Sequence, residues 1–407
     1  MLKRLSPLLP WLITSLLLVF PLNLFLVLNE SMGYSNGLRV DYLLPKLFLS
    51  DLIIVPIIII GVWEKRKLLH KHIKKSWMIG LLLAILLLSQ TFSSRPLIGA
   101  ITILKGLEIG LLFLILLLNR AVLKQSKVIW AATFGILMQT MFALYQFALQ
   151  KSLTPYWLFG ESNLSSGLVG LARTSYAGEE RLLAYGTTAH PNILAGISVL
   201  LLLYILNQKK RIYFKFLLVP VTTILFLTQS WSACLALVIG LLALYLPKIF
   251  HMNIVITIIW ICLVVPFFMP FLNFGNENYS ISRRVGLMDA ALKMIESKPL
   301  FGVGLNNFTV VLEEYSTPQE FVRFIQPVHN SLWLYLAETG VVGLLLFWRI
   351  CKKCMRYFRL EPVALALIPL LSLDHYLTTN QAGLLMLTVF ICAVIAVRSK
   401  EESLNQQ

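Results

Sequence analysis

Long apolar runs alternate with short polar segments along almost the whole chain of 407 residues. A helix needs about 20 mostly apolar residues to cross the hydrocarbon core of a bilayer. Runs that fit this template predict about twelve membrane-spanning helices, at residues 7–28, 43–63, 77–93, 97–119, 127–149, 189–207, 212–228, 231–249, 253–273, 330–349, 362–374 and 381–397. The pattern therefore predicts an all-α polytopic membrane protein in which residues 1–407 form a single membrane domain.

Two segments between the predicted spans are long enough to carry structure of their own, residues 150–188 and residues 273–329. Within the second, the stretch GLMDAALKMIESK at 286–298 places its leucine, methionine and isoleucine residues on one side of a helix and its charged residues on the other. Such a helix lies along a membrane surface. We expect an extracytoplasmic loop domain that carries this amphipathic helix.

Composition agrees with a membrane protein, because 58% of the residues are hydrophobic and only 13% are charged. Most of the 35 lysine and arginine residues fall in segments that the predicted spans place on the same side as the N-terminus. Cytoplasmic loops carry such an excess, so we expect both termini in the cytoplasm and the two long segments outside. The net charge of +16 predicts contact with anionic membrane lipids. Nothing in its pattern indicates nucleic-acid binding.

Three arginines outside the membrane are candidates for binding a phosphate group. Arg181 precedes the sixth predicted span, and Arg283 and Arg284 stand ahead of the predicted surface helix. A planar guanidinium group matches a diphosphate better than an ammonium group does. The alternative is that these side chains contact only lipid headgroups.

The tenth predicted span opens with polar residues, in the stretch VHNSLWLYLAETGVVGLLLF. A neutral imidazole such as that of His329 can accept a proton from a hydroxyl group. Asn330 follows it, and Ser331, Tyr335 and Glu338 recur at helical spacing, which predicts one polar stripe lining a cavity. We expect His190, Asp374 and His375 to line the same cavity. The alternative is that His329 only caps its helix while Glu338 pairs with another helix.

Several kinds of cofactor site are missing from the sequence. The chain has four aspartates, and no two are spaced as a DxD pair that would hold a divalent metal against a diphosphate. The glycine-rich stretch GVGLNNF does not follow a strand, so it predicts a tight turn rather than a phosphate-binding loop. We expect no metal and no other cofactor.

Five blocks of the sequence together resemble the O-antigen ligase and O-antigen polymerase superfamily: RLLAYGTTAHPNILAG, LTQSWSACLALVIGLL, SRRVGLMDAALKMIESKPLFGVGLNNF, VHNSLWLYLAETGVVGLLLF and DHYLTTNQAGLLM. The resemblance covers the chain from about Asp51 to Leu387. It implies a bacterial multi-pass membrane glycosyltransferase with a GT-C-like fold. Such an enzyme moves a glycan from undecaprenyl diphosphate to a glycan, lipid or other envelope acceptor outside the cytoplasmic membrane, without a metal.

The resemblance also implies roles for particular residues. Arg181 and Arg284 would bind the donor diphosphate, and His329 would orient or deprotonate the acceptor hydroxyl. One departure stands at Ser230 and Trp231, where members of the superfamily often have serine and arginine. If that arginine supports the site elsewhere, Arg283 or Arg173 takes its place here, or the substrate differs.

A direct displacement on the lipid-linked sugar predicts inversion at the anomeric carbon. The motifs do not separate a ligase, which transfers finished glycan, from a polymerase, which uses another lipid-linked repeat as acceptor. A transporter of lipid-linked oligosaccharide would also need arginines at the outer interface, but transporters usually contain an internal repeat that this sequence lacks. A scaffold subunit of an envelope-assembly complex is a further alternative.

Overall fold

The computed structural model describes residues 6–73, 77–165, 167–168, 170–176, 178–208, 212–249, 279–316, 325–355 and 358–397. These residues are mainly helical, with the helices α1 (Leu9–Val19), α2 (Asp51–Ile73), α3 (Trp77–Gln90), α4 (Pro96–Leu118), α5 (Ser126–Leu149), α6 (Tyr156–Phe159), α7 (Pro191–Asn207), α8 (Ile212–Thr228), α9 (Trp231–Tyr245), α11 (Tyr279–Ser297), α12 (Phe308–Val311), α14 (Ser331–Met355), α15 (Leu367–Ser372), α16 (Tyr376–Thr379) and α17 (Gln381–Val394). The prediction of a mainly helical protein is confirmed for this part of the chain.

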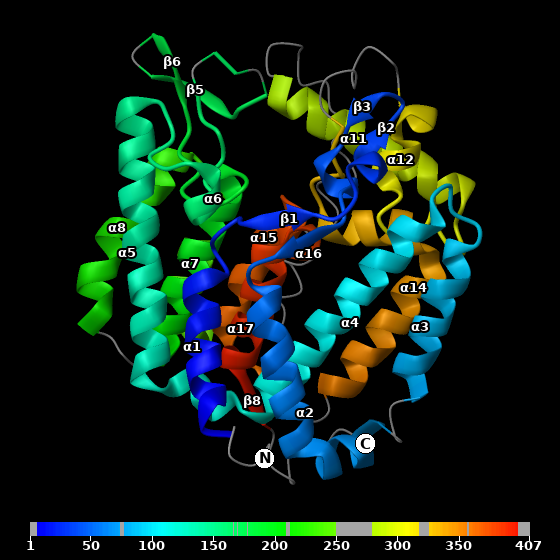
Figure 1. Cartoon of the computed structure of the whole chain (residues 1–407), viewed down its shortest axis with the longest axis horizontal. Coiled ribbons are helices and arrows are strands. Elements are labelled where there is room, and N and C mark those ends of the chain that lie inside the picture. The colour runs from blue at the N-terminus through cyan, green and yellow to red at the C-terminus, as the bar shows by residue number, and fades with distance from the viewer. Residues whose placement is uncertain are drawn as a thin grey trace.

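Short strands pair only as two-stranded antiparallel sheets within the described residues: β1 (Phe25–Val27) with β4 (Lys46–Phe48), β2 (Tyr34–Ser35) with β3 (Leu38–Arg39), β5 (Arg173–Tyr176) with β6 (Glu179–Leu182), and β7 (Phe358–Leu360) with β8 (Ile395–Val397). The β2–β3 and β5–β6 pairs lie with α11 at the upper end of the helical body (Figure 1). The start of α1 and β8 lie at the opposite, lower end.

Helix α7 forms the centre of the main hydrophobic core. Almost every residue of it is buried, including Leu200, Leu203 and Tyr204, which are fully buried. A helix that is apolar on all sides belongs either in a protein core or in a membrane, and here other helices surround it. Helices α5, α8, α9 and α17 pack directly against α7, and α1, α2 and α4 extend the same core.

Within the part of the chain that the structure describes, three helices are long and apolar enough to cross a membrane: α4, α5 and Ser331–Cys354 of α14. Shorter apolar helices accompany them, among them α1, α7, α8, α9 and α17. The helices agree with a membrane protein, but they do not confirm twelve spans. The predicted span at residues 253–273 lies outside the described residues.

The first predicted span was too long, and the second began too early. Helix α1 ends at Val19, two residues before a proline at position 21 that has no N–H to continue the helical hydrogen bonds. Helix α2 begins only at Asp51, since residues 46–48 pair with residues 25–27 as β4 and β1. The apolar residues that extended both predicted spans therefore belong to a small sheet between the helices.

The predicted surface helix at 286–298 is present as α11, but it begins earlier, at Tyr279. Arg283 and Arg284 consequently lie within the helix rather than ahead of it. One side of α11 packs against α12, the following turn and α14, through buried residues that include Leu287, Met294 and Phe308. This second cluster joins the surface helix to the start of α14.

Helix α14 is broken at Gly340, whose φ of 65° lies in the left-handed region. The break lies against the turn formed by GVGLNNF: the N–H of Val303 donates to the Ala337 carbonyl at 2.9 Å, and the N–H of Gly304 donates to the Glu338 carbonyl at 3.0 Å. A Cβ at Gly340 would lie 2.3 Å from backbone atoms of Leu300. Glycine is needed here for both its conformation and its small size.

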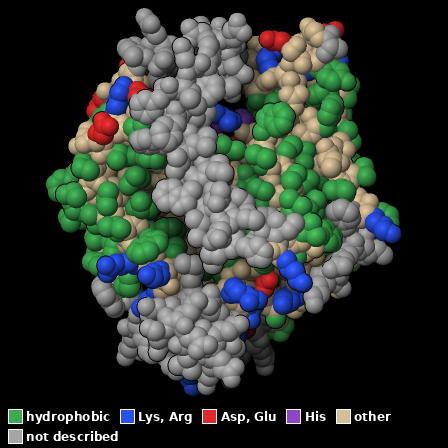
Figure 2. Space-filling view, turned by 180° about the vertical axis from the view of Figure 1, so that it is seen from behind, with side chains coloured by type: hydrophobic (Ala, Val, Ile, Leu, Met, Phe, Trp, Pro, Cys, Tyr) green, Lys and Arg blue, Asp and Glu red, His purple; other side chains and the backbone are tan. Residues whose placement is uncertain are grey.

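The outer surface fits a membrane environment. Figure 2 shows hydrophobic side chains over much of the middle of the molecule and a gathering of lysine and arginine side chains toward the lower end. The β5–β6 hairpin and α11 belong to the other half of the molecule, near the upper end in Figure 1. The separation matches the charge asymmetry from which the topology was predicted.

Candidate functional site

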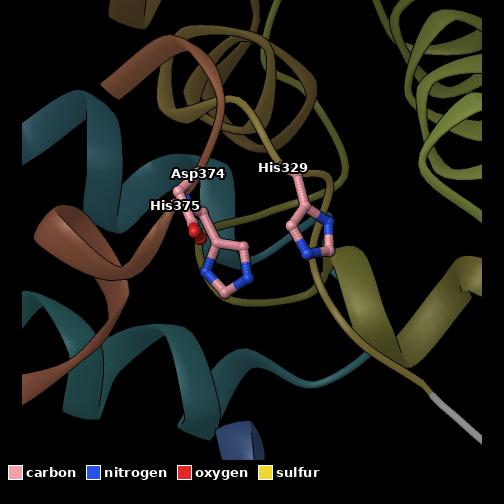
Figure 3. A group of neighbouring side chains, drawn as sticks. All are labelled: His329, Asp374 and His375. Atoms are coloured by element: carbon pink, nitrogen blue, oxygen red, sulfur yellow. The ribbon is translucent and has the colours of Figure 1, made fainter. Parts of the chain in front are cut away.

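Two histidines from distant parts of the sequence face each other. His329 lies two residues before the start of α14, and His375 lies between α15 and α16. Their ring centroids are 5.3 Å apart and their planes are inclined by 75°. Figure 3 shows that each imidazole turns one nitrogen toward the other ring. The second nitrogen of His329, Nδ1, is buried and has no hydrogen-bond partner among the described residues.

Asp374 completes this group, and its carboxylate is held from two sides. Oδ2 accepts a 2.7 Å hydrogen bond from the side-chain amide of Asn192, at the start of α7, and Oδ1 accepts one of 2.9 Å from the His375 N–H. Nδ1 of His375 lies 2.7 Å from the hydroxyl of Thr379, one turn further along. His375 and Asp374 are only 4% exposed. These bonds fix the orientation of both side chains relative to α7 and α16.

Positive charge reaches the histidines from α11. Burial and, to a smaller extent, the charge of Arg284 together lower the pKa of His375 to about 3. Burial also lowers the pKa of His329 well below its usual value, and His375, Arg284 and Arg283 each add to the shift. Both imidazoles are therefore neutral near pH 7. Arg283 and Arg284 themselves are half-buried.

Two further residues lie at the edge of the cluster. His190 is the N-cap of α7, and its Nδ1 accepts a hydrogen bond from the Asn192 N–H at 3.2 Å. It is close enough to Asp374 for the two side chains to influence each other electrostatically. The ring of Tyr42, from the segment between β3 and β4, meets the ring of His375 edge-on with centroids 5.5 Å apart.

The donor atoms of His329, Asp374 and His375 lie within 4.8 Å of one another, and a divalent metal accepts such a set. Three features oppose this use. Both oxygens of Asp374 already accept hydrogen bonds, Nδ1 of His375 is bonded to Thr379, and the charge of Arg284 acts on both rings. Neutral imidazoles beside a guanidinium group suit a hydroxyl group or an anion better than a cation.

Four predicted cavity residues serve the architecture of α14 instead. The side-chain oxygen of Asn330 accepts hydrogen bonds from the N–H groups of Leu332 and Trp333 at 3.0 and 3.1 Å, and its amide donates to the Ser372 carbonyl at 3.0 Å. Asn330 is thus a helix cap that also ties α14 to α15.

The side chains of the other three each bond to a different partner. The Ser331 hydroxyl donates to the Asp374 carbonyl at 3.2 Å, which keeps it beside the cluster. The Tyr335 hydroxyl points along its own helix to the Gly343 carbonyl at 3.5 Å. The Glu338 carboxylate accepts the N–H of Phe308 at 3.4 Å. The three side chains therefore have separate hydrogen-bond partners, and the turn before α12 takes up the Glu338 carboxylate.

Arg181 is not brought into the cluster. It lies in β6, where Nη2 is 3.7 Å from a carboxylate oxygen of Glu179 and the guanidinium group is 5.9 Å from the centroid of the Phe147 ring. Its charge is not among those that act on His329 or His375, whereas that of Arg284 acts on both. The two arginines therefore have different surroundings although their sequence contexts are alike.

Asn192, Thr379 and Tyr42 were not predicted as site residues. Thr379 follows His375 by four residues, and that spacing places two helical side chains side by side, so the sequence held a signal for it. The partner of Asn192 lies 182 positions away. Tyr42 reaches the cluster from the segment between β3 and β4, and no local sequence pattern predicts such a contact.

Comparison with known proteins bears on part of this cluster. Residues 216–348, about a third of the chain, match the model of the family described as O-antigen ligase. The matched part contains Arg283, Arg284 and His329, whereas Asp374 and His375 follow it. No curated protein matches the chain. The family match confirms the similarity of this protein to the O-antigen ligase and polymerase superfamily of bacterial membrane glycosyltransferases.

Proposed function

We propose that this protein transfers a glycan from undecaprenyl diphosphate to a hydroxyl group of an envelope acceptor, at the outer face of the bacterial cytoplasmic membrane, with both termini inside the cell. The observation that carries the proposal is the convergence of Arg284, from α11, with two neutral imidazoles, His329 and His375. The chemistry needs a cation for the departing diphosphate and a neutral base for the acceptor, and this cluster supplies both.

The reaction is a single displacement. The acceptor oxygen forms a bond to the anomeric carbon while the bond from that carbon to the diphosphate oxygen breaks, and its electron pair stays on the diphosphate. The acceptor proton passes to His329, a general-base contribution of roughly 10²–10⁴ in rate. Attack from the side opposite the leaving group inverts the anomeric configuration.

Arg284, together with Arg283, neutralises the charge that grows on the diphosphate. A diphosphate is a good leaving group, so charge stabilisation by preorganised donors is the main requirement. Half-burial on the first turns of α11 limits the freedom of both guanidinium groups and keeps them beside the histidines. Arg181 is left out of this role, since it contacts Glu179 of its own hairpin and Phe147 of α5.

The test uses the full chain in lipid nanodiscs, with lipid-linked oligosaccharide and an acceptor fraction isolated from the envelope of the source bacterium. Release of undecaprenyl diphosphate and the anomeric configuration of the product are measured. We expect transfer with inversion, an unchanged rate after chelation of divalent metals, and a loss of roughly 10²-fold or more in His329→Ala. Near-normal transfer by that variant would remove His329 from the mechanism.

The acceptor separates the two members of the superfamily that the motifs leave open. A ladder of products that grows by one repeat identifies a polymerase, whereas a single glycan on a different lipid identifies a ligase. A transporter would move lipid-linked oligosaccharide across proteoliposome membranes without releasing undecaprenyl diphosphate, and that result would refute the transfer reaction.

A further inference from the structure

The imidazole of His375 lies beside the proposed base, His329, and the proposed transfer reaction leaves it without a role. His375 is buried, and its ring faces His329 with the centroids 5.3 Å apart (Figure 3). The proposed base accounts for the acceptor proton, and Arg284 accounts for the diphosphate. A hydroxyl group bound for attack also has lone pairs, and orienting it requires a hydrogen-bond donor as well as an acceptor.

The contact with Thr379 indicates which ring nitrogen of His375 carries the proton. The His375 carbonyl already accepts hydrogen bonds from the N–H groups of Thr378 and Thr379 and from the Thr378 hydroxyl, at 2.9, 3.2 and 2.8 Å. The Thr379 hydroxyl is 3.1 Å from that crowded oxygen but 2.7 Å from Nδ1. It is therefore best used as a donor to Nδ1. In a neutral imidazole the proton then resides on Nε2.

The spacing of the two rings fits one small group between them. Ring nitrogens of His329 and His375 lie within 4.8 Å of each other. The Nδ1 atom of His375 is hydrogen-bonded to Thr379, and the Nδ1 atom of His329 is buried. The nitrogens that face each other are therefore the two Nε2 atoms. An oxygen about 2.8 Å from each nitrogen, a normal hydrogen-bond length, spans such a gap at a bent angle close to that of a hydroxyl group.

We propose that His375 positions the acceptor hydroxyl by donating from Nε2–H to its oxygen while His329 takes its proton. The inference rests on the proposed transfer reaction and assigns different tasks to two like side chains. The remaining lone pair of the oxygen attacks the anomeric carbon. The hydrogen bond with Thr379 fixes the tautomer of His375. The hydrogen bond from the backbone N–H of His375 to the Asp374 carboxylate holds this part of the backbone in place.

Glutamine separates the two tasks, because its side-chain amide can donate a hydrogen bond from about the position of Nε2 but cannot take up a proton. We expect His375→Gln to keep most of the transfer rate and His329→Gln to lose roughly 10²-fold or more. His375→Asn can still reach Thr379 but cannot reach the acceptor, and we expect a KM for the acceptor fraction about three- to ten-fold higher. Thr379→Val should show a smaller rise of the same KM.

Tyr376→Phe is the matched control. Its hydroxyl is buried, has no hydrogen-bond partner among the described residues, and lies against Gly196 on α7. This variant should transfer like the wild type. Binding of undecaprenyl diphosphate is measured for every variant, and we expect it to stay within about two-fold of wild type in His375→Asn.

The outcomes distinguish the two proposals. Wild-type protein that releases no undecaprenyl diphosphate would refute the transfer reaction and this inference with it. Active wild type combined with an unchanged acceptor KM in His375→Asn would refute only the inference. Weakened binding of undecaprenyl diphosphate in that variant would assign His375 to the donor instead. An active His329→Gln beside an inactive His375→Gln would show that the tasks are reversed.

Discussion

Replacement of Arg284 by alanine tests the proposed mechanism most directly. The guanidinium group is half-buried, and its charge lowers the pKa of both His329 and His375, so we expect it beside the departing diphosphate. Removal of one preorganised donor from such a position lowers a rate by about 10²–10³, which is about 3–4 kcal/mol. We expect that loss in kcat for release of undecaprenyl diphosphate, measured with the full chain in nanodiscs.

The variant should also change the pH dependence. In the wild type His329 has a lowered pKa, so it stays neutral, and able to accept a proton, well below pH 6.5. Loss of the positive neighbour raises the pKa of His329 toward its ordinary value, and the acidic limb of the rate profile moves to higher pH. A variant that had merely unfolded would lose activity at every pH, without such a displacement.

Two other arginine variants serve as controls. Arg284→Lys keeps the charge but loses the planar fork, so the acidic limb should stay in place while the rate falls less than in the alanine variant. Arg181→Ala removes a guanidinium group that contacts Glu179 and Phe147 instead, and we expect a rate within a few-fold of wild type. Equal losses in Arg181→Ala and Arg284→Ala would refute the assignment of the diphosphate to α11 alone.

Three further predictions concern the architecture of the site. Asn330→Ala removes a helix cap and a bond to α15, each worth about 1 kcal/mol. It should lower the thermal unfolding temperature in detergent, and Asn330→Asp, which keeps the cap, should lower it less; equal temperatures for Asn330→Ala and wild type would contradict the role. Between pH 7 and pH 5 the unfolded state takes up a proton at His375 that the folded state, with its pKa of about 3, does not. Stability should therefore fall by about 2 kcal/mol on acidification, and His375→Gln should flatten that pH dependence, whereas the same slope in both proteins would argue against it. Gly340→Ala forces a Cβ to within 2.3 Å of Leu300 at a φ of 65°; its yield of monodisperse protein should drop sharply, while Gly110→Ala, which has open space around its Cβ position, should express like wild type. Equal yields from these two glycine variants would show that the break in α14 is not required.

The local pattern of hydrophobicity determined much about this protein. It predicted a helical membrane protein, it located α8 at residues 212–228, and it located α4 and α5 to within a residue at either end. Such helices satisfy their backbone hydrogen bonds internally and carry apolar side chains along their whole length. The information needed to recognise them is therefore contained in each segment. The chemistry of arginine and histidine likewise identified Arg284, His329 and His375 from residue type and place along the chain.

Contacts between distant segments decided the rest. Pairing of residues 25–27 with residues 46–48 ended two apolar runs that look continuous with their helices. The turn at residues 299–304 broke α14 at a glycine that carries no signal for a break by itself. Arg181 and Arg284 are alike as interfacial arginines, and only the path of the chain put one on a hairpin and the other beside the histidines. Asn192 and Tyr42 joined the site for the same reason: the partner of a buried polar group is chosen by packing in three dimensions, and the neighbouring sequence does not record that choice.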